Sequence, residues 1–200
     1  MDLIIIRHAL PQRDERAEGQ GTADPELSTA GRHQAEATAE FLADEGIDHI
    51  AASPMRRAHQ TAMPLSLRRA LEIELLDGLR EADHYSPSYV PSEELTPDDD
   101  AYQLFVHDPL AIFEPHGGLE EFQATVVGAF EYLIGTNRGN RVAVFCHGLV
   151  MGVYLRSLLG HDDPYQLTPA YCGIMRVKAS TSGIRSVSSV NETAHIRHLL

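Results

Sequence analysis

The feature that most constrains the fold is an uninterrupted aliphatic run at residues 3–6, followed at once by Arg7 and His8. A continuous run rich in β-branched residues, without polar alternation, is typical of a strand covered on both faces of a parallel sheet. Pro11 prevents an easy continuation of that strand. The sequence therefore predicts a buried central strand whose carboxyl end carries a cation and an imidazole.

Shorter strand patterns alternate with helical patterns along the rest of the chain. Further strands are expected at residues 47–52, 71–76 and 141–146, with a hairpin or two edge strands at 174–178 and 183–190. Four helices are expected. The first is capped by Ser28 and has Gly46 as its C′ residue, and the second is opened by Ser53 and Pro54 and runs to about residue 68. The third covers residues 119–134, and the fourth covers 149–159 and stops at Gly160.

This alternation predicts an α/β fold, a three-layer α/β/α sandwich with a mostly parallel central sheet. Residues 82–118 interrupt it with five prolines and the acidic run at 98–100. We expect this segment to be an inserted lid, with a short helix near residues 102–107, in a single domain that spans residues 1–200.

Charge limits the partners. The 200 residues carry 29 Asp plus Glu against 16 Lys plus Arg, a formal net charge of −13. Such a chain is a poor sequence-independent binder of nucleic acid or anionic membranes, so neither partner is expected. No secretory pattern or apolar run of about 18 residues is present, and two cysteines make no disulfide framework, so we expect a cytoplasmic protein. The oligomeric state cannot be read from the sequence.

The expected strand ends bring polar residues to one rim, because ligands of such sheets bind outside the carboxyl ends of the strands. Arg7 and His8 end the first strand, Arg57 follows the second, Glu81 follows the third, and His147 with Gly148 follows the fourth. Guanidinium forks match phosphate oxygens, and the helix that opens at Gly148 adds positive potential at its N-terminus. The rim therefore favours a compact dianion, most naturally a phosphoryl group.

With these motifs the chain resembles the histidine phosphatases, the superfamily that includes the phosphoglycerate-mutase-like proteins. The resemblance covers nearly the whole chain in the family's order. The matching segments are LIIIRHA at residues 3–9, LSTAGRHQA at 27–35, SPMRRAHQTA at 53–62, LRE at 79–81, His147-Gly148, and the closing NETAHI at 191–196.

The resemblance implies a role for each matching residue. His8 is the implied nucleophile, which forms a phosphohistidine, and Arg7, Arg57 and His147 are the implied phosphate pocket. Glu81 is the implied general acid and base; Asp83, in the same loop, is left open as the alternative proton donor. The resemblance implies no cofactor and no metal, since arginines replace the cation.

Further positions follow less directly from the motifs. Asp14 stands where many relatives have a pocket asparagine, and Gln20 with Gly21 lies where a substrate loop is expected; with Gly148 these are candidate substrate contacts. Arg56 and Arg57 are about 100° apart on a helix, so they cannot both face the pocket, and the register of the family motif implies that Arg57 does.

Ala9 replaces the glycine of the usual Arg-His-Gly, which would be strained if φ there were positive.

The sequence favours hydrolysis over phosphoryl transfer. The mutase branch carries Glu-Arg-His-Tyr, whereas here Ala82-Asp83-His84-Tyr85 follows Glu81, and no Lys or Arg occurs over residues 81–137. We therefore expect a phosphomonoester hydrolase acting on a small molecule with a neutral or cationic leaving group, or on a phosphoprotein bearing Lys or Arg. The alternatives are a phosphoglycerate-type phosphomutase and a non-catalytic phosphate-binding protein, which would be expected to lack His8 or Glu81.

Overall fold

The aliphatic run forms strand β1 (Asp2–Arg7) inside a six-stranded sheet of order β4-β3-β6-β1-β7-β8. The computed structural model describes residues 1–17 and 19–200. Strands β3, β4 and β6 run parallel to β1. Strand β7 pairs antiparallel with β1, and β8 pairs antiparallel with β7. The bounds of the other sheet strands are His49–Ala52 (β3), Ile73–Leu75 (β4), Arg141–Cys146 (β6), Ile174–Ala179 (β7) and Arg185–Glu192 (β8).

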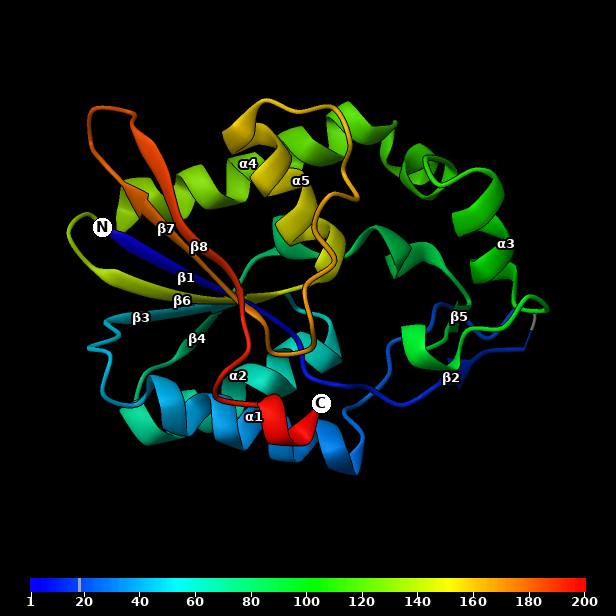
Figure 1. Cartoon of the computed structure of the whole chain (residues 1–200), viewed down its shortest axis with the longest axis horizontal. Helices are drawn as coiled ribbons and strands as arrows, with labels where there is room; N and C mark the ends of the chain where they lie inside the picture. The colour runs from blue at the N-terminus through cyan, green and yellow to red at the C-terminus, as the bar shows by residue number, and fades with distance from the viewer. Residues whose placement is uncertain (18) are drawn as a thin grey trace.

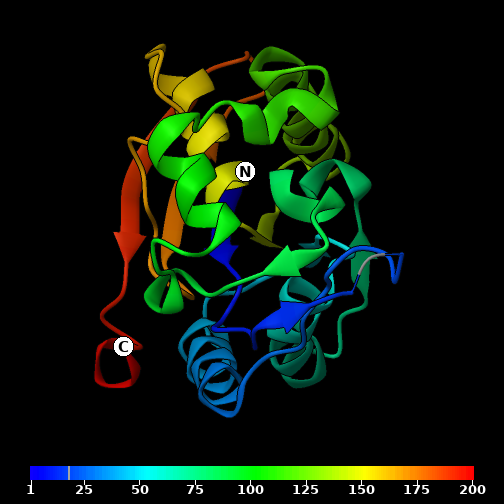
Figure 2. The same ribbon diagram turned by 90° about the vertical axis from the view of Figure 1, so that its right-hand side faces the viewer.

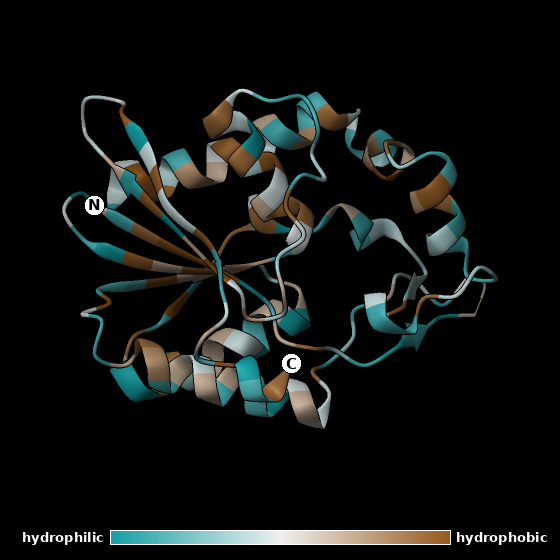
Figure 3. Cartoon of the chain, viewed as in Figure 1, coloured by the Kyte–Doolittle hydropathy of each residue, from teal (hydrophilic) through white to brown (hydrophobic). Residues whose placement is uncertain are grey.

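Helices cover both faces of the sheet, which confirms the three-layer sandwich (Figure 1). Helices α1 (Thr29–Leu42) and α2 (Arg56–Arg69) cover one face, and α4 (Leu119–Thr136) and α5 (Gly148–Leu159) cover the other. The strands are largely apolar along their length, and polar positions gather on the outer sides of the helices (Figure 3).

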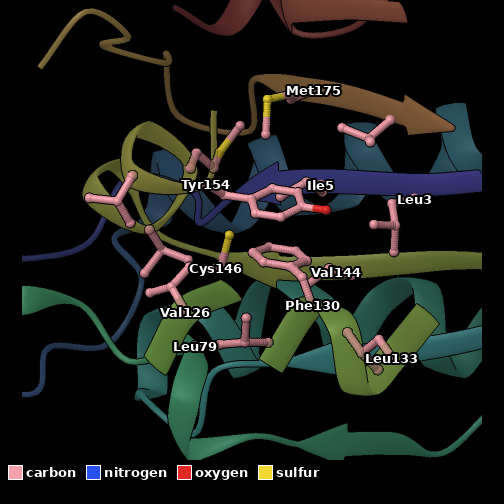
Figure 4. Close-up of a cluster of buried hydrophobic side chains, with 14 of the residues drawn as sticks. Leu3, Ile5, Leu79, Val126, Phe130, Leu133, Val144, Cys146, Tyr154 and Met175 are labelled. Atoms are coloured by element: carbon pink, nitrogen blue, oxygen red, sulfur yellow. The ribbon is translucent and has the colours of Figure 1, made fainter. Parts of the chain in front are cut away.

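Side chains of β1 alternate between two cores. Leu3 and Ile5 pack with Phe130 of α4 and Tyr154 of α5, whose rings stack at a centroid distance of 3.9 Å (Figure 4). Ile4 and Ile6 pack instead with residues of α1 and α2. Burial on both faces explains why the run lacks polar alternation.

Most expected boundaries are confirmed, and two are wrong. Ser28 caps α1, with its Oγ accepting a hydrogen bond from Gly31 N at 3.0 Å, and Gly160 ends α5 with a φ of 68°. However, α2 begins at Arg56 rather than at Pro54, because the Ser53 hydroxyl contacts His147 instead of capping a helix. Helix α1 ends at Leu42, so Gly46 lies beyond its C′ position.

The 82–118 segment lies beyond the carboxyl ends of the parallel strands (Figures 1 and 2). It contains β5 (Ser88–Tyr89), which pairs with β2 (Asp14–Glu15), and the expected short helix, α3 (Asp100–His107). Short 3-10 turns make up much of the remainder: Ala82–Tyr85, Ser92–Glu94 and Ala111–His116. Two further 3-10 turns lie outside the segment, at Asp77–Leu79 and Arg197–Leu199.

Over residues 1–17 and 19–200, the helices are all too short or too polar to cross a membrane.

Gly31 provides the first testable prediction. A Cβ at this position would overlap the Leu10 carbonyl oxygen, which accepts hydrogen bonds from the N–H and the hydroxyl of Ser28. Gly31→Ala should lower the free energy of unfolding by about 1–3 kcal/mol, measured by denaturant titration, because backbone must move to admit the methyl group. Gly128→Ala is the matched control: nothing lies within 4 Å of its added Cβ, so this helical position should gain slightly in stability. Equal effects of the two substitutions would contradict the prediction.

Candidate active site

Four segments that follow parallel strands converge at one end of the sheet. His8 follows β1, Ser53 follows β3, Glu81 lies beyond β4, and His147 follows β6. Arg57 joins them from the first turn of α2, with its side chain fully buried. All five residues are buried, which is unusual for polar and charged side chains and marks the cluster as a site.

The His8 ring is held in one orientation and one protonation state. Its Nδ1 lies 2.8 Å from the Ala9 carbonyl oxygen, which can only accept, so Nδ1 carries the proton and Nε2 has the lone pair. Burial, followed by the charges of Arg57 and Arg7, holds the pKa of His8 well below its usual value. His8 is therefore a neutral imidazole with a free Nε2.

The backbone at His8 is fixed without strain. The His8 N–H donates to the Cys146 carbonyl at 2.9 Å, and the Ala9 N–H donates to Thr61 Oγ1 at 3.0 Å. Ala9 does not have a positive φ, so alanine is accommodated in place of glycine.

The fully buried Arg57 and the half-buried Arg7 each have one fixed contact and N–H groups to spare. Arg7 Nη1 donates to the Pro169 carbonyl at 2.6 Å, and Arg57 Nη2 donates to Asp83 Oδ1 at 2.9 Å. Among the residues that the structure describes, Nε of both arginines and Nη1 of Arg57 have no hydrogen-bond partner. As expected, Arg56 instead points to the surface, where it contacts Glu26.

His147 lies beside His8 and contributes a further imidazole to the cluster. Its Nε2 lies 2.8 Å from Ser53 Oγ, its buried Nδ1 has no partner in the described part of the chain, and its ring centroid is 5.2 Å from that of His8. Burial and the charge of Arg57 hold the pKa of His147 well below its usual value. Gly148 lies close by, since a Cβ on it would be 3.7 Å from Arg7 Nε.

Two neighbouring carboxylates have different environments. Glu81 is buried, and its oxygens accept from Ala82 N at 3.0 Å and from Leu149 N, at the start of α5, at 2.9 Å. Burial and the charge of Asp83 raise the pKa of Glu81 to about 7. The Asp83 carboxylate is instead paired with the Arg57 guanidinium. Of the two candidate proton donors, Glu81 is thus the one that readily holds a proton near neutral pH.

Three of the expected contact residues are not brought into this cluster. The Asp14 carboxylate accepts from Arg16 at 2.7 Å and from Asp24 N at 3.1 Å. Gln20 and Gly21 lie in an exposed loop, where Gln20 contacts Ala17. Their roles in substrate binding remain predictions.

Candidate metal ligands and the cysteines give no second centre. Within residues 1–17 and 19–200, no group of three or more His, Cys, Asp or Glu side chains is placed to hold a metal ion. Cys146 and Cys172 are both buried and unbridged.

Sequence reasoning missed four residues that shape the cluster. Ser53 and Thr61 stand in the SPMRRAHQTA motif, and Thr61 follows Arg57 by four residues on the same helix face, a spacing that could have revealed it. Tyr89 and Tyr171 lie in irregular segments with no periodicity, so only the fold shows that their rings approach His8.

Comparison with known proteins identifies the family of the chain. The family model for the histidine phosphatase superfamily (branch 1) matches residues 3–192. Phosphoserine phosphatase 1 of Hydrogenobacter thermophilus is 30% identical over 164 residues, which are 80% of this chain and 77% of that protein. Phosphoglycerate mutase-like protein 4 of Arabidopsis thaliana is 28% identical over 164 residues, covering 78% of this chain and 70% of that one.

Solved structures share the fold. A phosphoserine phosphatase from Entamoeba histolytica, solved in complex with 3-phosphoglyceric acid, superposes with a TM-score of 0.74 at 23% identity and 98% coverage of both chains. The chain belongs to the histidine phosphatase superfamily. Within that superfamily it is a phosphatase enzyme.

The Asp83 contact generates a pH prediction. Asp83→Asn removes a negative charge beside Glu81, so the pKa of Glu81 should fall below about 7. A carbon-13 NMR titration of glutamate-labelled protein would follow this carboxyl directly. Asp44→Asn, which removes an exposed charge elsewhere, should leave the Glu81 titration unchanged. An unaltered Glu81 pKa in Asp83→Asn would show that burial alone raises it.

Proposed function

We propose that this protein hydrolyses phosphomonoesters through a phosphohistidine formed on His8. The observation that carries the proposal is the set of buried, unpartnered nitrogens of Arg7, Arg57 and His147 around a neutral imidazole. Buried donors without partners are costly, and a phosphoryl group would satisfy them together. The two fixed guanidinium charges, with a hydrogen bond from His147, supply the stabilisation that phosphoryl transfer requires, so the proposal includes no metal.

In the first half of the reaction, His8 Nε2 attacks phosphorus while the bond from phosphorus to the ester oxygen breaks. Glu81 gives its proton to the departing oxygen, and Arg7 and Arg57 neutralise the charge on the phosphoryl oxygens. Met55 N–H already donates to Ser53 Oγ, so we assign the Ser53 proton to His147 Nε2. His147 Nδ1–H is then free to donate to the phosphoryl group.

In the second half, water attacks the phosphohistidine. Glu81, now a carboxylate, takes a proton from the water as the bond from phosphorus to Nε2 breaks, and inorganic phosphate leaves. His8 returns to its neutral form, with Nδ1–H still held by the Ala9 carbonyl. A carboxyl with a pKa of about 7 suits both steps, since it gives and takes a proton with little cost at neutral pH.

The 82–118 segment is proposed to be the lid that contacts the leaving group. It reaches the site through Asp83, which pairs with Arg57, and through Tyr89, whose ring lies 6.5 Å from that of His8. The segment carries carboxylates and no Lys or Arg. An acidic, cation-free wall repels polyanionic leaving groups, so we propose a monoester whose alcohol is neutral or cationic.

The charge of the segment argues against a phosphomutase, and the states of His8 and Glu81 argue against a protein that only binds phosphate. A phosphoglycerate-type mutase returns the phosphoryl group to an anionic acceptor, which cations in the lid would have to hold. A protein that only binds phosphate would need neither an oriented nucleophile nor a protonated acid, yet both His8 and Glu81 are held in reactive states.

Phosphohistidine trapping tests the reaction. With a phosphomonoester labelled with 32P in its phosphoryl group, rapid acid or alkaline quenching should leave label on the protein, and alkali should preserve it better than acid, as expected for a phosphohistidine. His8→Ala should abolish both the label and phosphate release, because no nucleophile remains. His33→Ala, which removes an exposed histidine, should label normally.

Two results would decide against this mechanism. Labelling that persists in His8→Ala would exclude His8 as the nucleophile. A Glu81→Gln variant that hydrolyses an alkyl phosphate at the wild-type rate would exclude Glu81 as the acid, since loss of a general acid typically costs roughly 10²–10⁴-fold.

Leaving-group charge can be tested on a matched series. Phosphoethanolamine, glycerol phosphate and 3-phosphoglycerate have cationic, neutral and anionic leaving alcohols, and phosphoserine extends the series to a zwitterion. We expect kcat/KM to be at least about tenfold lower for 3-phosphoglycerate than for glycerol phosphate, since about 1.4 kcal/mol of repulsion suffices. Para-nitrophenyl phosphate serves as the activity control. A preference for 3-phosphoglycerate or a sugar bisphosphate would contradict the proposed lid selectivity.

A further inference from the structure

Arg7 and Arg57 are built into the site in the same way, although they come from different elements. Each guanidinium donates one N–H to a fixed acceptor, the Pro169 carbonyl for Arg7 and the Asp83 carboxylate for Arg57. Each also retains buried nitrogens without a partner in the described part of the chain. A single hydrogen bond does not by itself fix the plane of a guanidinium, so a second contact is needed to fix the plane of each one.

The central carbon of each guanidinium lies over a tyrosine ring. Arg7 Cζ lies 4.1 Å from the centroid of the Tyr171 ring, and Arg57 Cζ lies 4.6 Å from that of Tyr89. Both distances are well within the range of cation–π contacts, which are strongest where water is excluded. The same rings flank the nucleophile, with centroids 5.7 Å and 6.5 Å from that of His8.

The two rings come from segments that are far apart in the sequence. Tyr89 belongs to β5 in the 82–118 segment, and Tyr171 precedes β7 at the edge of the parallel strands. Tyr171 is itself tied to the 82–118 segment, because its hydroxyl donates to Glu93 Oε2 at 3.2 Å. The N–H of the next residue, Cys172, donates to the Arg7 carbonyl at 3.1 Å. This hydrogen bond ties the backbone beside Tyr171 to the backbone of Arg7.

We propose that Tyr171 and Tyr89 are positioning residues that set the planes of Arg7 and Arg57 for a phosphoryl group. The inference rests on the proposed function, since it gives these arginines the phosphoryl group as their ligand. One fixed N–H and one contact with a ring face restrict the orientation of each guanidinium, while Nε of both and Nη1 of Arg57 stay without a partner among the described residues. Such pre-orientation favours anion binding, because little freedom is lost when the ligand arrives.

Generic packing would make a different prediction. If the rings only filled space, their loss would lower stability and leave the affinity for an anion unchanged in the folded protein. If they orient the guanidiniums, a flat ring should suffice and the hydroxyl should matter little. The leucine variant therefore separates the two roles, and the phenylalanine variant separates the ring from its hydroxyl.

The experiment measures orthovanadate binding by isothermal titration calorimetry, which needs no turnover. The variants are Tyr171→Leu, Tyr89→Leu and the corresponding phenylalanines, each checked for folding by its melting temperature. Each leucine variant should raise the Kd for vanadate about tenfold, in the range that cation–π contacts allow, whereas each phenylalanine variant should stay within about threefold of wild type. Phe130→Leu, a lost aromatic ring in the core away from the site, should destabilise the protein without changing the Kd.

Each outcome has a distinct meaning. Wild-type protein that binds no vanadate would overturn the proposed phosphate site, and the tyrosine inference with it. Wild-type binding with an unchanged Kd in the leucine variants would overturn the tyrosine inference alone. A Kd that rises equally in the leucine and phenylalanine variants would also overturn it, because the hydroxyl rather than the ring would then be the required group. If a leucine variant fails to fold, methionine at the same position replaces it, and a vanadate Kd within about threefold of wild type in that variant would overturn the inference.

Discussion

The structure depends on two guanidinium charges held near the carboxyl end of β1, with Arg57 fully buried and Arg7 half-buried. A buried charge costs several kcal/mol unless it is paired, and here the pairing is incomplete: Asp83 meets Arg57, a carbonyl meets Arg7, and several N–H groups remain free. Their field, together with burial, keeps His8 neutral, because a second charge beside them would be repelled. The same incompleteness gives an incoming phosphoryl group its binding energy, so the stability lost in building the site is recovered when the ligand binds.

The surrounding fold keeps these charges from relaxing away from one another. Helix α1 approaches the chain after His8 so closely that only glycine fits at position 31. Thr61, four residues after Arg57 on α2, accepts from the Ala9 N–H and also donates to the Arg57 carbonyl, so one hydroxyl links the backbones of both residues. With the Ser53 hydroxyl bound to His147, the loops after three strands are locked by side chains rather than by helix caps. This is why α2 begins later than its serine and proline suggest.

Local sequence patterns therefore predict the periodic strands and helices, and they miss contacts between residues that are far apart in the sequence. The aliphatic runs and helical spacings were enough to place the central strands, the layers and the rim on which His8, Glu81 and His147 lie. Helical geometry allowed only one of Arg56 and Arg57 to face the pocket, and the register of the family motif selected Arg57. The partners of Arg7 and Arg57 could not be predicted in this way. Tyr89, Tyr171 and Asp83 reach the guanidiniums from segments without periodicity, and their positions depend on how the 82–118 segment folds back over the sheet.

Asp83 shows how closely the charges of this site are linked. It neutralises part of Arg57 and, through its own charge, raises the proton affinity of Glu81 two residues away. Asp83, the alternative proton donor, is already engaged by the Arg57 guanidinium at 2.9 Å. In the proposed reaction Asp83 therefore holds Arg57, and the buried Glu81 carries the proton. A phosphoryl dianion bound between the arginines would add negative charge near Glu81 and hold that proton more firmly until the leaving oxygen takes it.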